Sequence, residues 1–254
     1  SGPALCYLWD HRVSGRALLP GTGFMELSSA TAYACLADAL RVTAVTLADV
    51  SIRLPFEMPD SNKMLGGAAV PVLACKVELV TGQYEVQSPQ HGRAAANVAG
   101  HMSASKLVVC PRCCRRDAAW EGVVLRMATA WQVQIISSVE ACGDGEGGTI
   151  AGGRIRLGVK HITGTGYRAH PAAMDSSLHL NTVGMMQSKL APQVTRVPAA
   201  AGSFMVVGRA CAMTGTATLW TAPAAGPSAP VISNSLLQGA EGPTACGASI
   251  GQLE

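Results

Sequence analysis

Charged and aromatic side chains are scarce in this sequence of 254 residues. Only 14% of the residues are Asp, Glu, Lys or Arg and only 4% are Phe, Trp or Tyr, whereas 48% are hydrophobic. This balance excludes an intrinsically disordered chain, because disorder requires few apolar residues and much charge. The core must therefore be built from Ala, Val, Leu and Met. The length suits either one large domain or two fused units of half that size.

Long runs of one kind of residue are also missing. The formal net charge is +3, from 19 Lys and Arg against 16 Asp and Glu, and no basic run is long enough to follow a nucleic-acid backbone. Gly, Pro, Ser or charged residues interrupt every apolar run before it reaches the length of a membrane span. We therefore expect no nucleic acid and no membrane as partners, and a cytoplasmic location with an organelle as the alternative. Ser1-Gly2-Pro3 has neither an initiator Met nor a signal-peptide pattern, which predicts a domain cut from a longer chain.

A complete set of metal-binding cysteines is absent. The nine cysteines are odd in number and scattered through apolar stretches, as is typical of buried thiols in a reducing compartment. Cys110 and Cys113 have the spacing of half a zinc site, but no second Cys-x-x-Cys or His-x-x-x-His pair completes it. We therefore predict no metal site.

Helix signals occur twice along the chain, and strand signals follow each of them. Pro and Gly at residues 20–23 precede a helix over residues 24–37, for which Thr22 is the expected cap. Because this helix is small or apolar nearly all round, it should be buried against a sheet. A second helix begins at His170-Pro171, with Pro171 at the first helical position. We expect strands at residues 45–53, 70–80, 83–87, 94–102, 154–159, 204–209, 217–220 and 231–237.

The chain thus repeats one α+β plan, a helix followed by antiparallel strands. We place the first unit at residues 1–105 and the second at residues 120–254. Between them, residues 106–119 form a linker marked by charge, proline and a cysteine cluster. The Gly-rich residues 143–153 contain two acids that would repel a phosphate, so we expect a hairpin turn there and not a phosphate-binding loop.

His11 begins the pattern HxxxGxxxxP, which ends at Pro20 and leads directly into the first helix. A helix N-terminus presents unpaired N–H groups and a positive dipole, which together can hold a developing oxyanion. On the second helix, Asp175 and His179 are four residues apart and so share a face. Apolar neighbours should raise the pKa of Asp175 and keep it protonated. An acid and a base are therefore predicted, with an ordinary helix ion pair or a metal pair as open alternatives.

A resemblance strengthens the acid–base hypothesis. The run His170-Pro171-x-x-Met174-Asp175-x-x-x-His179 is similar to HPxxLDxxxQ/H, and with the His11 motif it resembles the dehydratase domain of polyketide synthases. The resemblance extends over nearly the whole chain, including residues 47–59 and Val197-Pro198. It implies a double hotdog, in which two units, each a long helix wrapped by an antiparallel sheet, share one active site.

The resemblance also implies a reaction. His11 would remove the α-proton of a 3-hydroxyacyl thioester, and Asp175 would protonate the leaving hydroxyl group to give a 2-enoyl thioester. The backbone N–H of Gly21 would meet the charge on the thioester oxygen. The substrate-binding and supporting residues would be His179, Gly21, Gly15, Pro20 and Pro171.

The partners implied by the resemblance follow from how such a substrate is carried. It would arrive on the phosphopantetheine arm of an acyl carrier protein, and no metal or other cofactor is needed. Neighbouring synthase domains are further expected partners, and a homodimer within the synthase is compatible with this organisation.

Two other functions stay open at this point. A product-template cyclase of poly-β-ketones also pairs a His with an Asp, although His170-Pro171 and residues 47–59 favour a dehydratase. The third hypothesis is an inactive dehydratase-like scaffold. It is motivated by the missing YGPxFQ segment, where Trp131-Gln132 stands at the Phe-Gln position and Met127 at the Tyr position.

Overall fold

A computed structural model gives the architecture of both halves of the chain. It describes residues 3–40, 44–59, 72–90, 93–105, 136–143, 149–156, 167–187, 198–207, 214–221, 233–239 and 247–253. Neither of the long helices in these ranges combines the length and the apolar composition needed to cross a bilayer. The predicted linker at residues 106–119 lies outside the described ranges, as do the positions expected to match YGPxFQ.

The N-terminal half has one long helix, which is followed by strands of the main sheet. A 3-10 helix, η1, and a small hairpin of strands β1 and β2 come before it. The elements are η1 (Pro3–Asp10), β1 (Arg12–Val13), β2 (Arg16–Ala17), α1 (Gly21–Leu40), β3 (Ala44–Ile52), β4 (Ala74–Glu78), β5 (Gln83–Gln90) and β6 (Arg93–Ser105).

The C-terminal half has two strands before its long helix and further strands after it. The elements are β7 (Ile136–Gly143), β8 (Thr149–Arg156), α3 (Pro171–Gln187), β9 (Ala200–Val207), β10 (Thr214–Thr221), β11 (Ser233–Gly239) and β12 (Gly247–Leu253). The second half therefore repeats the helix-and-strands plan of the first.

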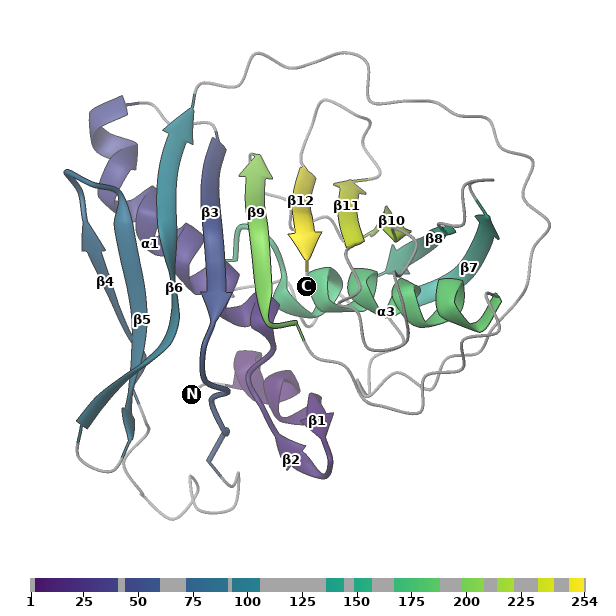
Figure 1. Ribbon diagram of the computed structural model, residues 1–254, viewed down its shortest axis with the longest axis horizontal. Coiled ribbons are helices and arrows are strands. Elements are labelled where there is room, and N and C mark those ends of the chain that lie inside the picture. The colour runs from purple at the N-terminus through teal and green to yellow at the C-terminus, as the bar shows by residue number, and fades with distance from the viewer. Residues whose placement is uncertain are drawn as a thin grey trace.

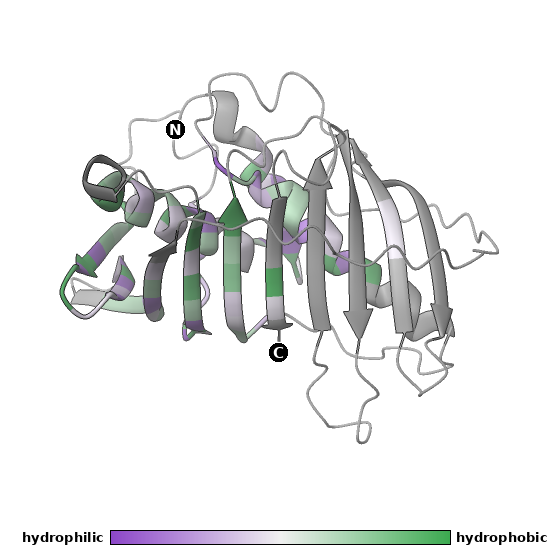
Figure 2. Cartoon of the chain, turned by 90° about the horizontal axis from the view of Figure 1, so that it is seen from above, coloured by the Kyte–Doolittle hydropathy of each residue, from purple (hydrophilic) through white to green (hydrophobic). Residues whose placement is uncertain are grey.

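The strands of the two halves join into one antiparallel sheet. Its order is β4-β5-β6-β3-β9-β12-β11-β10-β8-β7, and the halves meet where β3 pairs with β9. Helix α1 packs on β3 to β6, and α3 packs on β7, β8, β10 and β11. Figure 1 shows the two helices on the same face, running outward from the middle of the sheet, and Figure 2 shows the same layering from above. The predicted α+β double hotdog is confirmed, with the two units sharing a continuous sheet.

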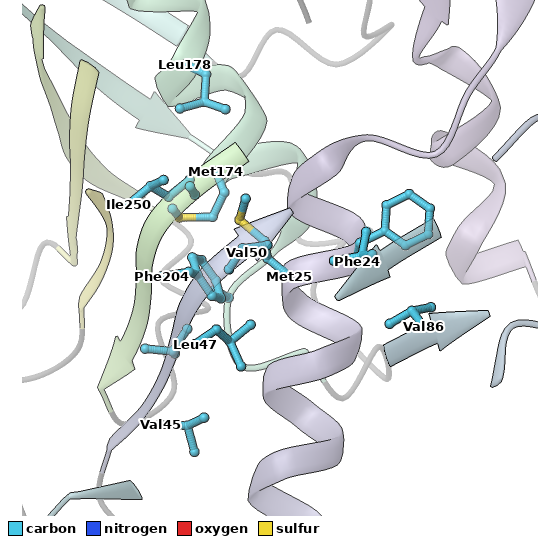
Figure 3. Packing of buried hydrophobic residues seen from close by; sticks show 14 of the residues in the cluster. Phe24, Met25, Val45, Leu47, Val50, Val86, Met174, Leu178, Phe204 and Ile250 are labelled. Atoms are coloured by element: carbon cyan, nitrogen blue, oxygen red, sulfur yellow. The ribbon is translucent and has the colours of Figure 1, made fainter. Parts of the chain in front are cut away.

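The core crosses the junction between the halves. Phe24 and Met25 of α1 are at most 1% exposed, as is Met174 of α3. Phe204 of β9 and Ile250 of β12 belong to the same buried cluster (Figure 3). Burial of each such side chain contributes roughly 1.5–3 kcal/mol. Both helices therefore pack against one common sheet, and the shared core fixes how they lie relative to each other.

The start of α1 differs from the sequence prediction. Helix α1 begins at Gly21, and the carbonyl of Pro20 accepts the N–H of Gly23 at 2.8 Å. Thr22 was the expected cap, but it lies inside the first turn and its hydroxyl donates to the Pro171 carbonyl at 3.0 Å. The prediction of a Thr22 cap is wrong because a long-range acceptor, on the other helix, binds this hydroxyl. Pro171 is the first residue of α3, as predicted.

The Gly-rich stretch is also only partly a turn. Strand β8 begins at Thr149 and includes Gly152 and Gly153, which the sequence places in a turn. Gly153 pairs with Ala217 of β10 on one side and with Val139 of β7 on the other. Two neighbouring strands supply the backbone hydrogen bonds that offset the poor strand propensity of glycine. The turn prediction is therefore wrong for residue 143, which ends β7, and for residues 149–153.

Candidate functional site

His11 is placed by a tight hairpin. Val13 pairs with Arg16 across the turn Ser14-Gly15, and both turn residues have positive φ, 51° and 80°. Two successive residues in the left-handed region form the type I′ turn that suits a two-residue hairpin. Gly15 thus supports His11 through the backbone, since nothing lies within 4 Å of where its Cβ would be.

The hairpin returns a carbonyl group to His11 and so selects the form of its ring. Nδ1 of His11 lies 2.7 Å from the carbonyl oxygen of Leu18. A carbonyl can only accept, so Nδ1 carries the proton and a neutral ring has its lone pair on Nε2. That Nε2 lies 3.8 Å from Oδ2 of Asp175. In its neutral form, His11 therefore directs Nε2, the nitrogen without a proton, toward the second half of the chain.

Asp175 lies between two imidazole rings. Its Oδ2 is 3.4 Å from Nε2 of His179, one turn further along α3. The Asp175 side chain is 7% exposed, against 15% for His11 and 30% for His179. Burial lowers the pKa of His179, but the hydrogen bond and charge of Asp175 outweigh it, and the net pKa is raised. Asp175 and His179 therefore form a pair that retains a proton readily.

The beginning of α1 lies against the beginning of α3, where the Thr22 hydroxyl donates to the Pro171 carbonyl. Pro20 is buried and precedes Gly21, whose N–H, as the first of the helix, has no acceptor within it. A Cβ at Gly21 would lie 2.8 Å from Cδ1 of Ile52 and 3.8 Å from Cβ of Pro198. Glycine is needed at position 21 because Ile52 packs against the place where a side chain would begin.

The beginning of α3 is closed by His170. Its Nδ1 accepts the N–H of Ala172 at 3.2 Å, so the ring serves as the helix cap. The same ring lies 4.8 Å from Tyr7 and 5.3 Å from Tyr167, measured between centroids, and is 1% exposed. His170 and Pro171 thus set where α3 starts, and through it where Asp175 lies.

Glu26 is a residue of this region that the sequence prediction missed. It is 3% exposed, and its two oxygens accept the N–H groups of Arg168 at 2.6 Å and Ala169 at 3.0 Å. Burial raises its pKa, while those N–H bonds and the Arg168 charge lower it, and the balance is a pKa of about 7. The signal was present in the sequence, because Glu26 is the only charged residue on an otherwise apolar helix before Asp38.

A hollow of about 510 Å³ lies elsewhere, on the outer face of the sheet. Asp49, Lys76 and His101 are among its lining residues, and none of the predicted site residues is. Within the described ranges, no group of three or more His, Cys, Asp or Glu has a metal-site arrangement. Cys110 and Cys113 lie outside those ranges.

The geometry brings His11, Asp175 and His179 together at the meeting point of the two halves. Gly21, Pro20 and Pro171 lie at the helix starts beside them, and Gly15 lies in the exposed hairpin turn. One half supplies the His11 imidazole, and the other supplies the Asp175 carboxyl group with His179 beside it. The fold and the site together define a double-hotdog protein in which two histidines and an aspartate meet at the junction of the halves.

Comparison with known proteins agrees with this class. Residues 1–68 match the family model described as "Polyketide synthase dehydratase domain". This match includes the motif from His11 to Pro20, and together with the solved structures it confirms the predicted resemblance. No curated protein matches the chain in sequence.

Solved structures extend the likeness to nearly the whole chain. A GphF dehydratase variant superposes with a TM-score of 0.74 at 17% identity over 97% of this chain and 87% of that chain. The dehydratase domain of PpsC from Mycobacterium tuberculosis has a TM-score of 0.72 at 19% identity over 100% of this chain and 89% of that chain. An enoyl-isomerase of a trans-acyltransferase polyketide synthase has a TM-score of 0.68 at 11% identity over 97% of this chain and 93% of that chain. At these identities the structures show a common fold, which is that of polyketide synthase dehydratase domains.

Proposed function

We propose that the protein eliminates water from a 3-hydroxyacyl chain carried on an acyl carrier protein. The observation that carries the proposal is the approach of His11 Nε2 to Asp175 Oδ2, at 3.8 Å across the junction of the halves. One structure of the PpsC dehydratase domain holds C12:1-CoA, an acyl thioester, which supports this class of substrate. The carrier protein and neighbouring synthase domains are the partners that such a substrate requires.

In the proposed reaction, His11 acts as the base and the Asp175–His179 pair acts as the acid. Nε2 of His11 takes the proton from the α-carbon, and the electron pair released forms the double bond between the α- and β-carbons. The bond from the β-carbon to the hydroxyl oxygen breaks as the Asp175–His179 pair donates a proton to that oxygen, so water leaves. In this proposal the N–H of Gly21, the first residue of α1, stabilises the charge that develops on the thioester oxygen.

The cycle closes within the same cluster. After water leaves, His11 carries an extra proton and the Asp175–His179 pair lacks one. At 3.8 Å between Nε2 and Oδ2, a small relaxation or one bridging water allows the proton to return. The protein therefore ends in its starting protonation state, and the only net change is the loss of one water from the substrate.

A double-bond shift is the second candidate, because one similar structure is an enoyl-isomerase. Moving a double bond needs a proton carrier, whereas expelling a hydroxyl group also needs an acid beside the oxygen. Asp175 and its His179 partner supply that acid here, which favours dehydration. The product-template cyclase and the inactive scaffold become outcomes of the test below.

The test follows a 3-hydroxyacyl carrier protein by mass spectrometry of the intact acyl chain. We expect the wild-type protein to remove one water, and His11→Ala and Asp175→Asn to lose the activity. His101→Ala and Asp49→Asn are the matched controls, since both residues line the hollow on the outer sheet face. Retention of water by every substrate, with a folded protein, would contradict the proposal and leave the scaffold. Migration of a double bond in an enoyl substrate without water loss would favour the isomerase, and ring closure of a poly-β-keto chain the cyclase.

A further inference from the structure

Glu26 of α1 binds a segment far away along the chain. Its carboxyl oxygens accept the backbone N–H groups of Arg168 and Ala169, which are 142 and 143 residues further on. These N–H groups immediately precede His170-Pro171, where α3 begins. One buried side chain therefore joins the second turn of α1 to the segment just before α3.

Two more residues of α1 hold the same segment. The Thr22 hydroxyl donates to the Pro171 carbonyl at 3.0 Å. The Arg168 guanidinium lies 3.6 Å from the centroid of the Tyr33 ring. Positions 22, 26 and 33 lie on one side of a helix with 3.6 residues per turn. One side of α1 thus contacts residues 168–171.

This attachment fixes the distance between the two chemical groups of the site. His11 is tied to the chain ahead of α1 through the Leu18 carbonyl, at 2.7 Å. Asp175 is in the second turn of α3, four residues after Pro171. The separation of His11 from Asp175 therefore depends on how the start of α3 sits on α1.

Two converging N–H donors explain why a carboxylate is used. A carboxylate offers an acceptor oxygen to each donor, whereas an amide would turn its NH₂ group toward one of them. The neighbouring Arg168 guanidinium offsets part of the cost of burying the charge.

We propose that Glu26 is a positioning residue of the acid–base site, which holds the backbone ahead of α3 and so keeps Asp175 within reach of the substrate bound at His11. The inference deepens the proposed function and rests on it for its kinetic part. Its structural part, the tie between Glu26 and residues 168–169, can be measured on the free protein.

The first measurement is amide hydrogen exchange of Arg168 and Ala169 in the wild type and in Glu26→Gln. We expect both amides to exchange at least about 10-fold faster in the variant while the strand amides of β3 and β9 are unchanged. Ser28→Ala is the matched control. Ser28 is buried on the same helix but bonds the Phe24 carbonyl of its own turn, so residues 168–169 should be unaffected. Equal exchange in wild type and Glu26→Gln would overturn the proposal.

The second measurement separates positioning from a merely structural role. We expect Glu26→Gln to lower kcat about 10- to 100-fold with KM for the carrier-bound substrate changed by less than about threefold, because misplacing a catalytic group by an ångström has that effect. Ser28→Ala should keep the wild-type kcat. A Glu26→Gln kcat within about twofold of wild type, or a rise in KM alone, would overturn the positioning role.

Thr22→Val keeps the proposal testable if Glu26→Gln does not fold. It removes the hydroxyl that donates to Pro171 and preserves the shape of the side chain. We expect faster exchange of Arg168 and Ala169 and a smaller loss of kcat, again without a change in KM. Unchanged exchange would contradict the proposal. If the wild-type protein shows no dehydration at all, the exchange data still decide the structural part, so the two failures are distinguishable.

Discussion

The two long helices begin with the same backbone bond but differ in their side chains. The carbonyl of Pro20 accepts the N–H of Gly23 at the start of α1, and the carbonyl of His170 accepts the N–H of Ala173 at the start of α3. At the start of α3, the His170 ring caps the Ala172 N–H, and Pro171 has no N–H to offer. Among the described residues, a side chain caps the first turn of α3, which is the closed start, and none caps that of α1, which is the open start.

Because of this difference, we expect the two halves to contribute different groups to the site. An open start can contribute backbone N–H groups and dipole to a bound oxyanion, whereas a closed start cannot. Helix α3 instead contributes side chains, because Asp175 and His179 project from one face while Glu26 and Thr22 of α1 hold its first residues. We therefore expect changes at the two starts to have separable effects on binding, rate and stability.

The largest effect is expected where Glu26 binds the backbone ahead of α3. Its pKa is raised from 4.5 to about 7, so the folded state holds a proton that the unfolded state releases between these values. The free energy of unfolding should therefore fall as the pH rises from about 4.5 to about 7, by roughly 3 kcal/mol from this group alone. Denaturant unfolding across this pH range should show a flatter dependence in Glu26→Gln. The same slope in both proteins would contradict the assignment.

The next effect tests the open start of α1. A Cβ at Gly21 meets Cδ1 of Ile52 at 2.8 Å, so Gly21→Ala should displace the helix start and lower kcat about 10-fold. Ile52→Val removes that methyl group, and we expect the double variant Gly21→Ala/Ile52→Val to recover most of the rate. Steady-state kinetics of the two single variants and the double variant give the comparison. No loss in Gly21→Ala would mean that the open start is not used.

The spacing of residues predicts part of this site. Asp175 and His179 share a helix face because they are four residues apart, and the pattern from His11 to Pro20 places an imidazole ahead of a buried helix. The hydrogen-bonding form of His11 could not be predicted, because it depends on the hairpin that returns the Leu18 carbonyl.

Contacts between distant segments are the part that local patterns do not contain. Thr22 has the residue type and place of a cap, yet its hydroxyl is bound by Pro171, 149 residues away. Glu26 is conspicuous as a single charge on an apolar helix, but its acceptor role depends on where residues 168–169 lie. In the sheet, Gly152 and Gly153 are strand residues only because β7 and β10 flank them.

The smallest effect is expected in the hairpin that leads His11 to the start of α1. Gly15 has a φ of 80°, which an alanine adopts at a cost of roughly 1 kcal/mol. Nothing lies within 4 Å of its Cβ position, so no steric clash adds to this cost. Thermal unfolding of Gly15→Ala should therefore show a small loss of stability, whereas Ser14→Gly, at a φ of 51°, should show none. A fall of more than about 3 kcal/mol in the free energy of unfolding of Gly15→Ala would mean that a steric clash, and not the positive φ, sets the cost.

The central claim is that one residue from each half acts in a single chemical step. The most direct measurement is the rate of water loss from a 3-hydroxyacyl carrier protein in His11→Ala, Asp175→Asn and the variant with both changes. We expect each single change to lower kcat by about 10³-fold and the double change to lower it no further, because residues that act as a unit are not additive. Losses that multiply in the double variant would show that the two residues act independently and would contradict the account.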